Sequence, residues 1–300
     1  MFQFGKKVTN AHDEGIWCVK WQGDIIATGG MGPKVKSWHG VSTPDFLKER
    51  KVFDKHILGV TSLDIDVSNK YLATGGLDGT IRIFDLNTNT LYKSLDSGPL
   101  GCLKIGFLNN ADRLVSVSES GNITIYSTES GEKLKTISNQ NKQILTMAIS
   151  PNNEQIIVGG LDGVVSCYEV ESGRRITEIK AHGVPVRSLS FSSDSKTIFT
   201  GGEDSQIRLH DPNSSTPYIA SLMGHSSFIL SLAASRDGNL LASSGSIDKK
   251  VCIWDIKTRK LDSTFTAHAD HVWDLAWSPD STKLVSVSDD GSLHSYALKQ

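Results

Sequence analysis

A sequence pattern recurs along the chain at a nearly constant period and restricts the folds that the chain can adopt. Its clearest copy, from Gly224 to Asp255, reads GHSSFILSLAASRDGNLLASSGSIDKKVCIWD. Apolar residues alternate in ILSLA, LLASS and VCIWD, and turn-forming residues separate these stretches, which predicts three half-buried antiparallel strands joined by tight turns. The turn aspartate Asp248 has counterparts at successive steps of 42 to 46 residues: Gly32, Asp78, Ser120, Asp162, Asp204 and Asp290. Seven units therefore fill the 300 residues.

Two further positions recur with the same period. A flat ring stands six residues after the turn position, as Trp38, Phe84, Tyr126, Tyr168, His210, Trp254 and Tyr296. The units open with His12, His56, Gly98, Gln140, His182, His225 and His268. A Gly-His start and a Trp-Asp finish at this period are typical of one blade of a WD-repeat propeller. The sequence predicts an all-β fold, a seven-bladed WD-repeat β-propeller that forms a single domain over residues 1–300.

The seventh unit lacks one strand. A strand precedes the histidine position in other units, as in RITEIK before His182, but the chain ends at SLHSYALKQ, which is the third strand of the last unit. Residues 3–9 occupy the corresponding place before His12. We expect this N-terminal segment to complete the last blade, because an open ring would expose unpaired strand edges.

Composition argues against several classes of protein. The net charge is -2, basic residues are scattered, and no long apolar run or secretory leader is present. We therefore expect an intracellular protein that binds neither nucleic acid nor membrane directly. Cys18, Cys102, Cys167 and Cys252 lie in predicted strands without a CxxC pair. They indicate buried thiols in a reducing compartment, and we expect no metal and no cofactor.

Polar residues recur at positions that could form a hydrogen-bonded strut inside each blade, as WD-repeat proteins do with His, Ser or Thr, Asp and Trp. Unit six is predicted to hold the full set, His225, Ser244, Asp248 and Trp254. Three other units are predicted to hold its first three members: His56, Thr74 and Asp78; His182, Thr200 and Asp204; His268, Ser286 and Asp290. A set of this kind resembles a catalytic triad. Because the spacing recurs in four units, a structural role is the better interpretation, and we expect no enzyme activity.

One face of a propeller collects the loops that enter the first strand of each blade and the turns at the strut aspartates. We call it the top face. The third and fifth residues after the histidine position, and the residue before the turn position, should lie there. The predicted partner-binding residues are Trp17, Met31, Leu77, Leu161, Arg187, Phe228, Leu230, Ile247, His271 and Trp273. An exposed set so rich in apolar and aromatic side chains is typical of a protein-binding surface. Leu103 and Leu145 could instead line the channel wall.

Longer sequence segments within the units resemble one particular family of WD-repeat proteins. They are AHDEGIWCVKW in unit one, SGPLGCLKIGF in unit three, ILTMAISP in unit four, AHGVPVRSLSF in unit five and HADHVWDLAW in unit seven. In this order, the whole chain resembles the WD-repeat subunit of the superkiller (Ski) complex, a family also found in the polymerase-associated factor (PAF) transcription complex.

The resemblance implies a non-enzymatic adaptor, monomeric within a hetero-complex, in the cytoplasm and nucleus. It would bridge a tetratricopeptide scaffold and an RNA helicase that supply messenger RNA to the exosome for 3'-to-5' decay. The resemblance also implies a second role in transcription elongation with PAF complex subunits and, in fungi, binding to the meiotic DNA-breaking enzyme. Partners would present a segment with Gln-Arg and a trailing apolar residue to the top face.

Three other functions are alternatives to the adaptor. A ubiquitin-ligase substrate receptor is expected to carry Trp-Asp-x-Arg, whereas unit six reads Trp254-Asp255-Ile256-Lys257. A heterotrimeric G-protein β-type subunit is expected to have a long helix before its first blade, and only residues 1–11 precede His12. Direct RNA binding is a third alternative, which a filter-binding assay would detect.

Overall fold

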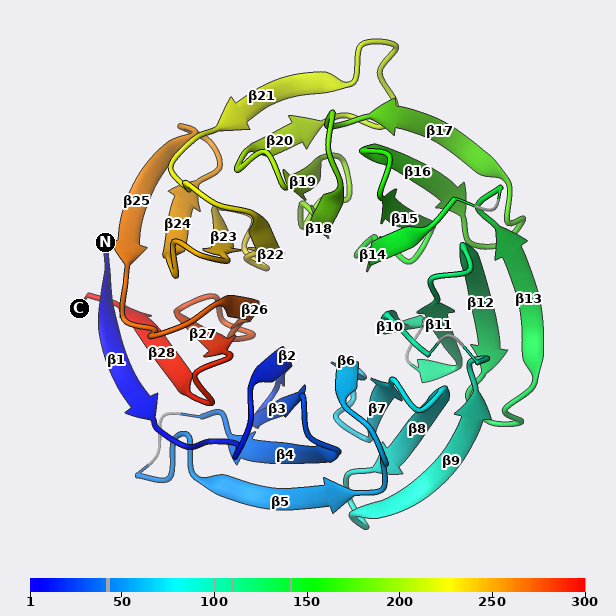
Figure 1. Cartoon of the computed structure of the whole chain (residues 1–300), viewed down its shortest axis with the longest axis vertical. Coiled ribbons are helices and arrows are strands. Elements are labelled where there is room, and N and C mark those ends of the chain that lie inside the picture. The colour runs from blue at the N-terminus through cyan, green and yellow to red at the C-terminus, as the bar shows by residue number, and fades with distance from the viewer. Residues whose placement is uncertain (42–43, 100, 109–110, 141, 300) are drawn as a thin grey trace.

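The structure, a computed structural model, forms seven four-stranded antiparallel sheets arranged as blades around a central channel (Figure 1). It describes residues 1–41, 44–99, 101–108, 111–140 and 142–299. This is the predicted seven-bladed propeller. Within the described ranges, no helix has the length and hydropathy that are needed to cross a membrane. Outside the described residues lie, among others, Ser42 and Thr43 between units one and two, Leu100 of SGPLGCLKIGF, and Asn141.

Each blade runs from the channel outward through four strands. The innermost strands are β2 (Ile16–Gln22), β6 (Val60–Ile65), β10 (Lys104–Leu108), β14 (Ile144–Ile149), β18 (Val186–Phe191), β22 (Ile229–Ala234) and β26 (Val272–Trp277). The second strands are β3 (Ile25–Gly30), β7 (Tyr71–Gly76), β11 (Arg113–Val117), β15 (Gln155–Gly160), β19 (Ile198–Gly202), β23 (Leu240–Gly245) and β27 (Lys283–Ser288). The third strands are β4 (Lys34–His39), β8 (Thr80–Asp85), β12 (Asn122–Ser127), β16 (Val164–Glu169), β20 (Ile207–His210), β24 (Val251–Asp255) and β28 (Leu293–Leu298). The outer strands are β5 (Glu49–Asp54), β9 (Thr90–Asp96), β13 (Lys133–Ser138), β17 (Arg175–Lys180), β21 (Tyr218–Leu222), β25 (Lys260–Phe265) and, for blade seven, β1 (Phe2–Val8).

The side chains of the second strands are more buried than those of the outer strands. All six residues of β3 are buried, whereas β17 buries only Ile179. The second strand is flanked on both faces by neighbouring blades, and its small and β-branched side chains fill that space. The hydrophobic core is therefore divided among the seams between blades. In one seam, Val35 of blade one packs in the same cluster as Val60 and Leu72 of blade two.

Side chains of the innermost strands also connect neighbouring blades. The backbone N–H of Val19 in blade one donates to Asp274 Oδ2 in blade seven at 3.0 Å. The N–H of Phe107 in blade three donates to Asp64 Oδ2 in blade two at 2.8 Å. An innermost strand has no strand partner on its channel side, so these carboxylates satisfy backbone donors that would otherwise need water.

The N-terminal strand closes the ring, as predicted. β1 pairs with β28 in antiparallel register, with Phe2 opposite Leu298 and Val8 opposite Leu293. The Phe2 ring is buried and meets the edge of the Trp277 ring at a centroid distance of 5.5 Å. The Phe2 N–H also donates to Ser263 Oγ of blade six at 3.1 Å. Strand β1 thus contacts both its own blade and the preceding one.

Two local expectations differ from the structure. Cys102 precedes β10 and is not in a strand; its N–H donates to the Gly76 carbonyl at 3.2 Å, because the chain enters blade three through a loop that bonds to blade two. The connection HGVSTPDFLKERKVFDK in unit one is longer than its counterparts, which suggests a surface insertion, but part of it is buried in the fold. Leu47 in this connection is buried, and the Phe46 ring packs against Trp21 at 5.9 Å. The connection covers the edge of blade one, where apolar area would otherwise meet water.

Deletion of residues 1–9 should lower the midpoint of thermal unfolding far more than an exposed substitution such as Gln3→Ala. The deletion removes the outer sheet partner of β28 and the buried Phe2 side chain, and leaves β28 paired with β27 alone. Loss of a buried Phe alone costs about 3–5 kcal/mol. Differential scanning calorimetry of the two variants and the unmodified chain tests this, and an unchanged midpoint after the deletion would contradict closure by β1.

Candidate functional site

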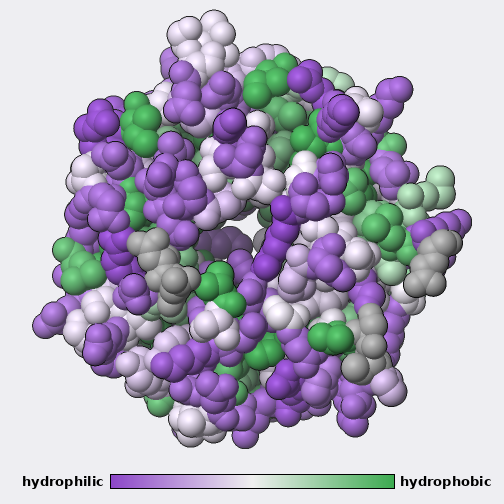
Figure 2. Space-filling view, turned by 180° about the vertical axis from the view of Figure 1, so that it is seen from behind, coloured by the Kyte–Doolittle hydropathy of each residue, from purple (hydrophilic) through white to green (hydrophobic). Residues whose placement is uncertain are grey.

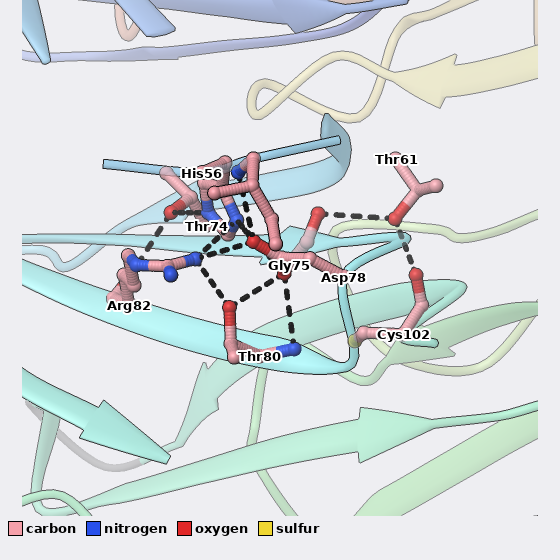
Figure 3. Close-up of polar contacts among 9 residues, drawn as sticks. His56, Thr61, Thr74, Gly75, Asp78, Thr80, Arg82 and Cys102 are labelled. Carbon is pink, nitrogen blue, oxygen red and sulfur yellow. Dashed lines mark hydrogen bonds and ion pairs between the residues drawn. The ribbon is translucent and has the colours of Figure 1, made fainter. Parts of the chain in front are cut away.

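Hydrogen-bonded struts hold the top loops against the sheets. In blade two, His56 Nε2 lies 2.8 Å from Thr74 Oγ1, and His56 Nδ1 lies 3.1 Å from Asp78 Oδ2 (Figure 3). Asp78 also accepts from the backbone N–H groups of Ile57 and Thr80, each at 3.1 Å. The His–Ser/Thr–Asp geometry recurs in blades five and seven. Each aspartate therefore ties the loop before the first strand to the turn between the second and third strands.

The prediction that Ser244 belongs to the strut of blade six is wrong. In blade six, Ser243 Oγ lies 2.8 Å from both His225 Nε2 and Trp254 Nε1, whereas the buried Ser244 Oγ has no hydrogen-bond partner among the described residues. Successive side chains in a strand point to opposite faces, so a shift of one residue selects the wrong face. The hydroxyl residue stands 18 residues after the histidine in blades two, five, six and seven. This constant spacing could have identified Ser243.

Blade one holds a shorter strut that the sequence interpretation missed. His12 Nε2 lies 2.8 Å from Thr28 Oγ1, and the Trp38 indole N–H donates to the same hydroxyl at 2.9 Å. Gly32 stands where the other struts have aspartate. Burial, followed by the nearby positive charge of Lys36, lowers the pKa of His12 to about 4. Without a carboxylate partner, this histidine is neutral at pH 7.

Blades three and four, which lack the histidine, use the ring position instead. The Tyr126 hydroxyl donates to the Asp96 carbonyl at 3.2 Å, and the Tyr168 hydroxyl donates to Asn139 Oδ1 at 2.7 Å. Both acceptors precede the first strand of their blade. The tyrosine hydroxyl therefore anchors the top loop in these two blades.

The pKa of the strut histidine is shifted in different directions in different blades. In blade six, burial disfavours the charged form, but the bond with Asp248 raises the pKa of His225 to about 9. In blades two and five, the pKa values of His56 and His182 are lowered, first by burial. Arg82 and Arg208 oppose the charged form there, because each guanidinium binds the strut aspartate, at 2.8 Å in blade two and 3.0 Å in blade five.

A cluster of His268, Asp290 and His294 does not suit a metal ion, although its ligand atoms lie within 4.8 Å of one another. The two imidazole rings are stacked, with centroids 3.8 Å apart and planes at 7°. Ring lone pairs lie in the ring plane, so those of two parallel rings cannot converge on one ion at about 2.0–2.1 Å. His268 Nε2 already bonds to Ser286, and His294 Nε2 to Ser292. The arrangement stabilises the last blade.

The fifth residue after the histidine position leaves the strand ladder at a β-bulge. In blade one, Ile16 pairs with Gly30 and Cys18 with Gly29, so Trp17 is the extra residue. The same bulge isolates five counterparts: Thr61, Leu145, Arg187, Leu230 and Trp273. A bulge re-aims a side chain that regular pleating would send into the sheet. Thr61 shows this, since its hydroxyl donates to the Gly75 carbonyl at 3.1 Å and to the Cys102 carbonyl of the next blade (Figure 3).

Five of the predicted partner-binding residues are exposed apolar side chains: Met31, Leu77, Leu161, Phe228 and Ile247. Ile247 is 72% exposed. In blade six, the Ser246 N–H donates to the Phe228 carbonyl at 3.0 Å, which brings Ile247 beside Phe228. Leu103 is half-buried and packs against the core between blades three and four, consistent with the channel-wall alternative. The two leucines Leu145 and Leu230 are also half-buried.

The structure adds Ile57 and Leu58, which sequence interpretation missed. They are 78% and 51% exposed. They precede Gly59, where an added Cβ would lie 2.8 Å from the Trp17 ring and 2.9 Å from the Met31 carbonyl oxygen. The Leu77 N–H donates to the Gly59 carbonyl at 2.9 Å. Trp17, Met31, Ile57, Leu58 and Leu77 therefore form one apolar surface, the blade 1–2 patch. The sequence shows two apolar residues directly after His56, where blade one has the acidic pair of AHDEG, but their exposure depends on the packing of Gly59 against Trp17.

The seam between blades seven and one brings together three predicted residues. The Trp17 indole N–H donates to Asp289 Oδ1 at 3.3 Å, and His271 Nδ1 lies 3.5 Å from Asp289 Oδ2. The rings of His271 and Trp273 are 6.4 Å apart, and the buried Trp273 indole nitrogen has no hydrogen-bond partner among the described residues. Arg187, on blade five, pairs instead with Glu203 at 2.6 Å. The seam is thus the most connected part of the predicted surface.

Ser243→Ala should lower the free energy of unfolding by about 1–3 kcal/mol, whereas Ser244→Ala should have little effect. The first change leaves His225 Nε2 and the Trp254 indole N–H without a buried partner. The second removes a hydroxyl that bonds to nothing in the described structure. Urea denaturation of this matched pair measures the difference, and equal midpoints would contradict the strut geometry.

Stability should fall as the pH is lowered below 6.5, because burial and the neighbouring His268 lower the pKa of His294 to about 3. The unfolded chain takes up this proton near pH 6.5 and the folded chain does not. Each such histidine therefore lowers the free energy of unfolding by about 1.4 kcal/mol for every pH unit below 6.5. Denaturation of the unmodified chain and His294→Leu between pH 7.5 and 4.5 should give a flatter dependence for the variant. Parallel curves would disprove the assignment to His294.

Comparison with known proteins agrees with this architecture. The family WD domain, G-beta repeat (WD40) matches residues 47–85, 131–169, 173–211, 217–255 and 259–296. Each match begins at an outer strand and ends at the third strand of the next blade. The repeat in the sequence is therefore offset by one strand from the blade, which is why β1 completes blade seven.

A relative that matches along the whole chain identifies the family more narrowly. Superkiller complex protein 8 of Dictyostelium discoideum is 81% identical over 300 residues, which is the full length of both chains. WD repeat-containing protein SL1-17 of Schistosoma mansoni is 30% identical over 129 residues, 41% of this chain and 42% of its own. WD repeat-containing protein VIP3 of Arabidopsis thaliana is 30% identical over 140 residues, 44% of this chain and 42% of its own. The chain belongs to the superkiller complex protein 8 family of WD-repeat proteins.

Proposed function

We propose that the chain is a non-enzymatic adaptor subunit of a superkiller (Ski) complex and that its top face binds the partner proteins. The observation that carries this proposal is the full-length 81% identity to superkiller complex protein 8. The repetition of the His–Ser/Thr–Asp set as a strut in several blades supports a structural role for those residues. A rigid ring with variable top loops suits an adaptor, because binding residues tend to lie on loops held by a rigid scaffold.

The proposed partners are a tetratricopeptide scaffold and an RNA helicase, in a complex that assists exosome-mediated decay of messenger RNA. A second role with PAF complex subunits would place the protein in the nucleus as well as the cytoplasm. The top face supports protein binding by its chemistry. Its blade 1–2 patch and the exposed Phe228 and Ile247 offer apolar area, and large exposed apolar patches mark interaction sites.

The proposed anchor residues are Trp17 and Trp273 at the seam, with Phe228 and Leu230 in blade six. Aromatic side chains dominate the binding energy of many interfaces. An arginine of the partner could stack on an indole, and such cation–π contacts are worth about 0.5–2 kcal/mol. The carboxylate of Asp289, which both Trp17 and His271 contact, would favour a positive partner side chain at the same seam.

Trp273→Ala should weaken binding of the tetratricopeptide scaffold by at least about 2 kcal/mol, or roughly thirty-fold. Val67→Ala is the matched control, because Val67 is an exposed apolar residue that follows the innermost strand β6, at its end away from the top loops. Calorimetric titration with a scaffold peptide that bears Gln-Arg measures both variants, with circular dichroism as the check on folding. Undiminished binding by folded Trp273→Ala would show that the binding site does not lie at the seam. Membership of the complex is tested separately, by identifying the chains that co-purify with the protein.

A further inference from the structure

The central channel holds a cavity, and its lower half, on the side away from the top face, reaches the turns that follow the innermost strands. The channel has a volume of about 510 Å³, within the range of small-molecule sites. The eighth residue after the histidine position lines it in every blade. In five blades this residue is small: Gly106, Ala148, Ser190, Ala233 and Ala276. Figure 2 shows the opening of the channel on this face, ringed mainly by hydrophilic residues.

The other two blades place charged residues at the same level. Lys20 Nζ lies 2.8 Å from Asp64 Oδ1. The second oxygen of Asp64 accepts from the backbone N–H of Phe107 at 2.8 Å. The carboxylate is therefore shared between a side-chain cation and a backbone donor that belongs to the next blade. It has little capacity left for a second cation.

A second cation lies at the lower end of the channel. Arg236, which follows β22 in blade six, donates from its guanidinium to Gln22 Oε1 in blade one. The Gln22 amide in turn donates to the Val67 carbonyl at 3.2 Å. The partner of Arg236 is thus a neutral amide, although a guanidinium offers five N–H donors. Arg236 is exposed, and Asp64 acts on its guanidinium through charge alone.

The remaining carboxylates of the channel lining are occupied. Asp66 accepts from the backbone N–H groups of Ser68 and Tyr71 in its own turn. Asp274 accepts from the Val19 N–H and from Ser231 Oγ, at 3.0 and 2.8 Å. Neither group bonds to Arg236 or Lys20 in the described structure. Two further cations, Lys104 and Arg187, line the same cavity, and Arg187 pairs with Glu203. The cavity therefore carries an excess of cations, of which Lys20 shares the Asp64 carboxylate and Arg236 bonds to a neutral amide.

We propose that the lower half of the channel binds a small oxyanion, either a carboxylate or a phosphate, between Arg236 and Lys20. The planar guanidinium matches the two oxygens of such a group, and the Lys20 ammonium adds a second charge-assisted bond. The small residues of the other blades leave the room that the rest of the ligand needs. The site lies on the side opposite the proposed partner surface and does not depend on the proposed function.

Calorimetric titration of the intact chain with sodium phosphate and with sodium acetate tests the site, with sodium chloride holding the ionic strength constant. Binding to the unmodified chain should be saturable. It should weaken at least about tenfold in Arg236→Gln and in Lys20→Met, because each change removes a charge-assisted hydrogen bond. Arg174→Gln, an exposed arginine outside the channel, is the matched control and should bind normally.

Tighter binding of phosphate than of acetate would identify a phosphoryl ligand, and the reverse order a carboxylate. Thermal unfolding of each variant reports whether it folds. If Arg236→Gln does not fold, Lys20→Met decides the question alone. Absence of saturable binding to the unmodified chain, or equal binding by all folded variants, would overturn the proposal and leave Arg236 as a structural link between blades six and one.

Discussion

The structure depends on the mutual covering of the blades. A four-stranded sheet with two apolar faces is stable only when both faces are covered, and in this ring each blade covers its two neighbours. The pairing of β1 with β28 supplies the last covering element, because Phe2 joins the same apolar cluster as Val251 of blade six and Trp277 of blade seven. The first and last strands are thereby coupled across the whole length of the chain.

Buried polar bonds and exposed apolar residues have separate roles on the top face. The struts satisfy the donors and acceptors of the loops, as His56 and Asp78 do in blade two, and so hold the loop backbone. The side chains beside them can then vary without loss of the fold. Ile57 and Leu58, which adjoin that strut, provide exposed apolar area for a partner. Stability and binding are therefore encoded by different residues of the same loop.

The sequence predicted the architecture well because the period, the turn residues and the alternation of apolar residues are repeated seven times. Closure by the N-terminal strand followed from counting strands. The prediction failed at Ser244, where two adjacent serines left the strand face ambiguous until the spacing of 18 residues was compared among blades. It also missed Ile57 and Leu58, since their exposure depends on how Gly59 packs against Trp17. Contacts between residues far apart in the chain, such as Trp17 with Asp289, needed the closed ring.

Hydrogen–deuterium exchange of the chain, alone and bound to its tetratricopeptide partner, tests the central claim that the top face is the binding surface. The account predicts slower exchange on binding in residues 57–61, 228–230 and 271–273, which carry the exposed apolar and seam residues. Exchange in the turns at residues 66–71 and 235–240, at the lower end of the channel, should stay unchanged. Protection confined to those lower turns, with no change in the top loops, would contradict it.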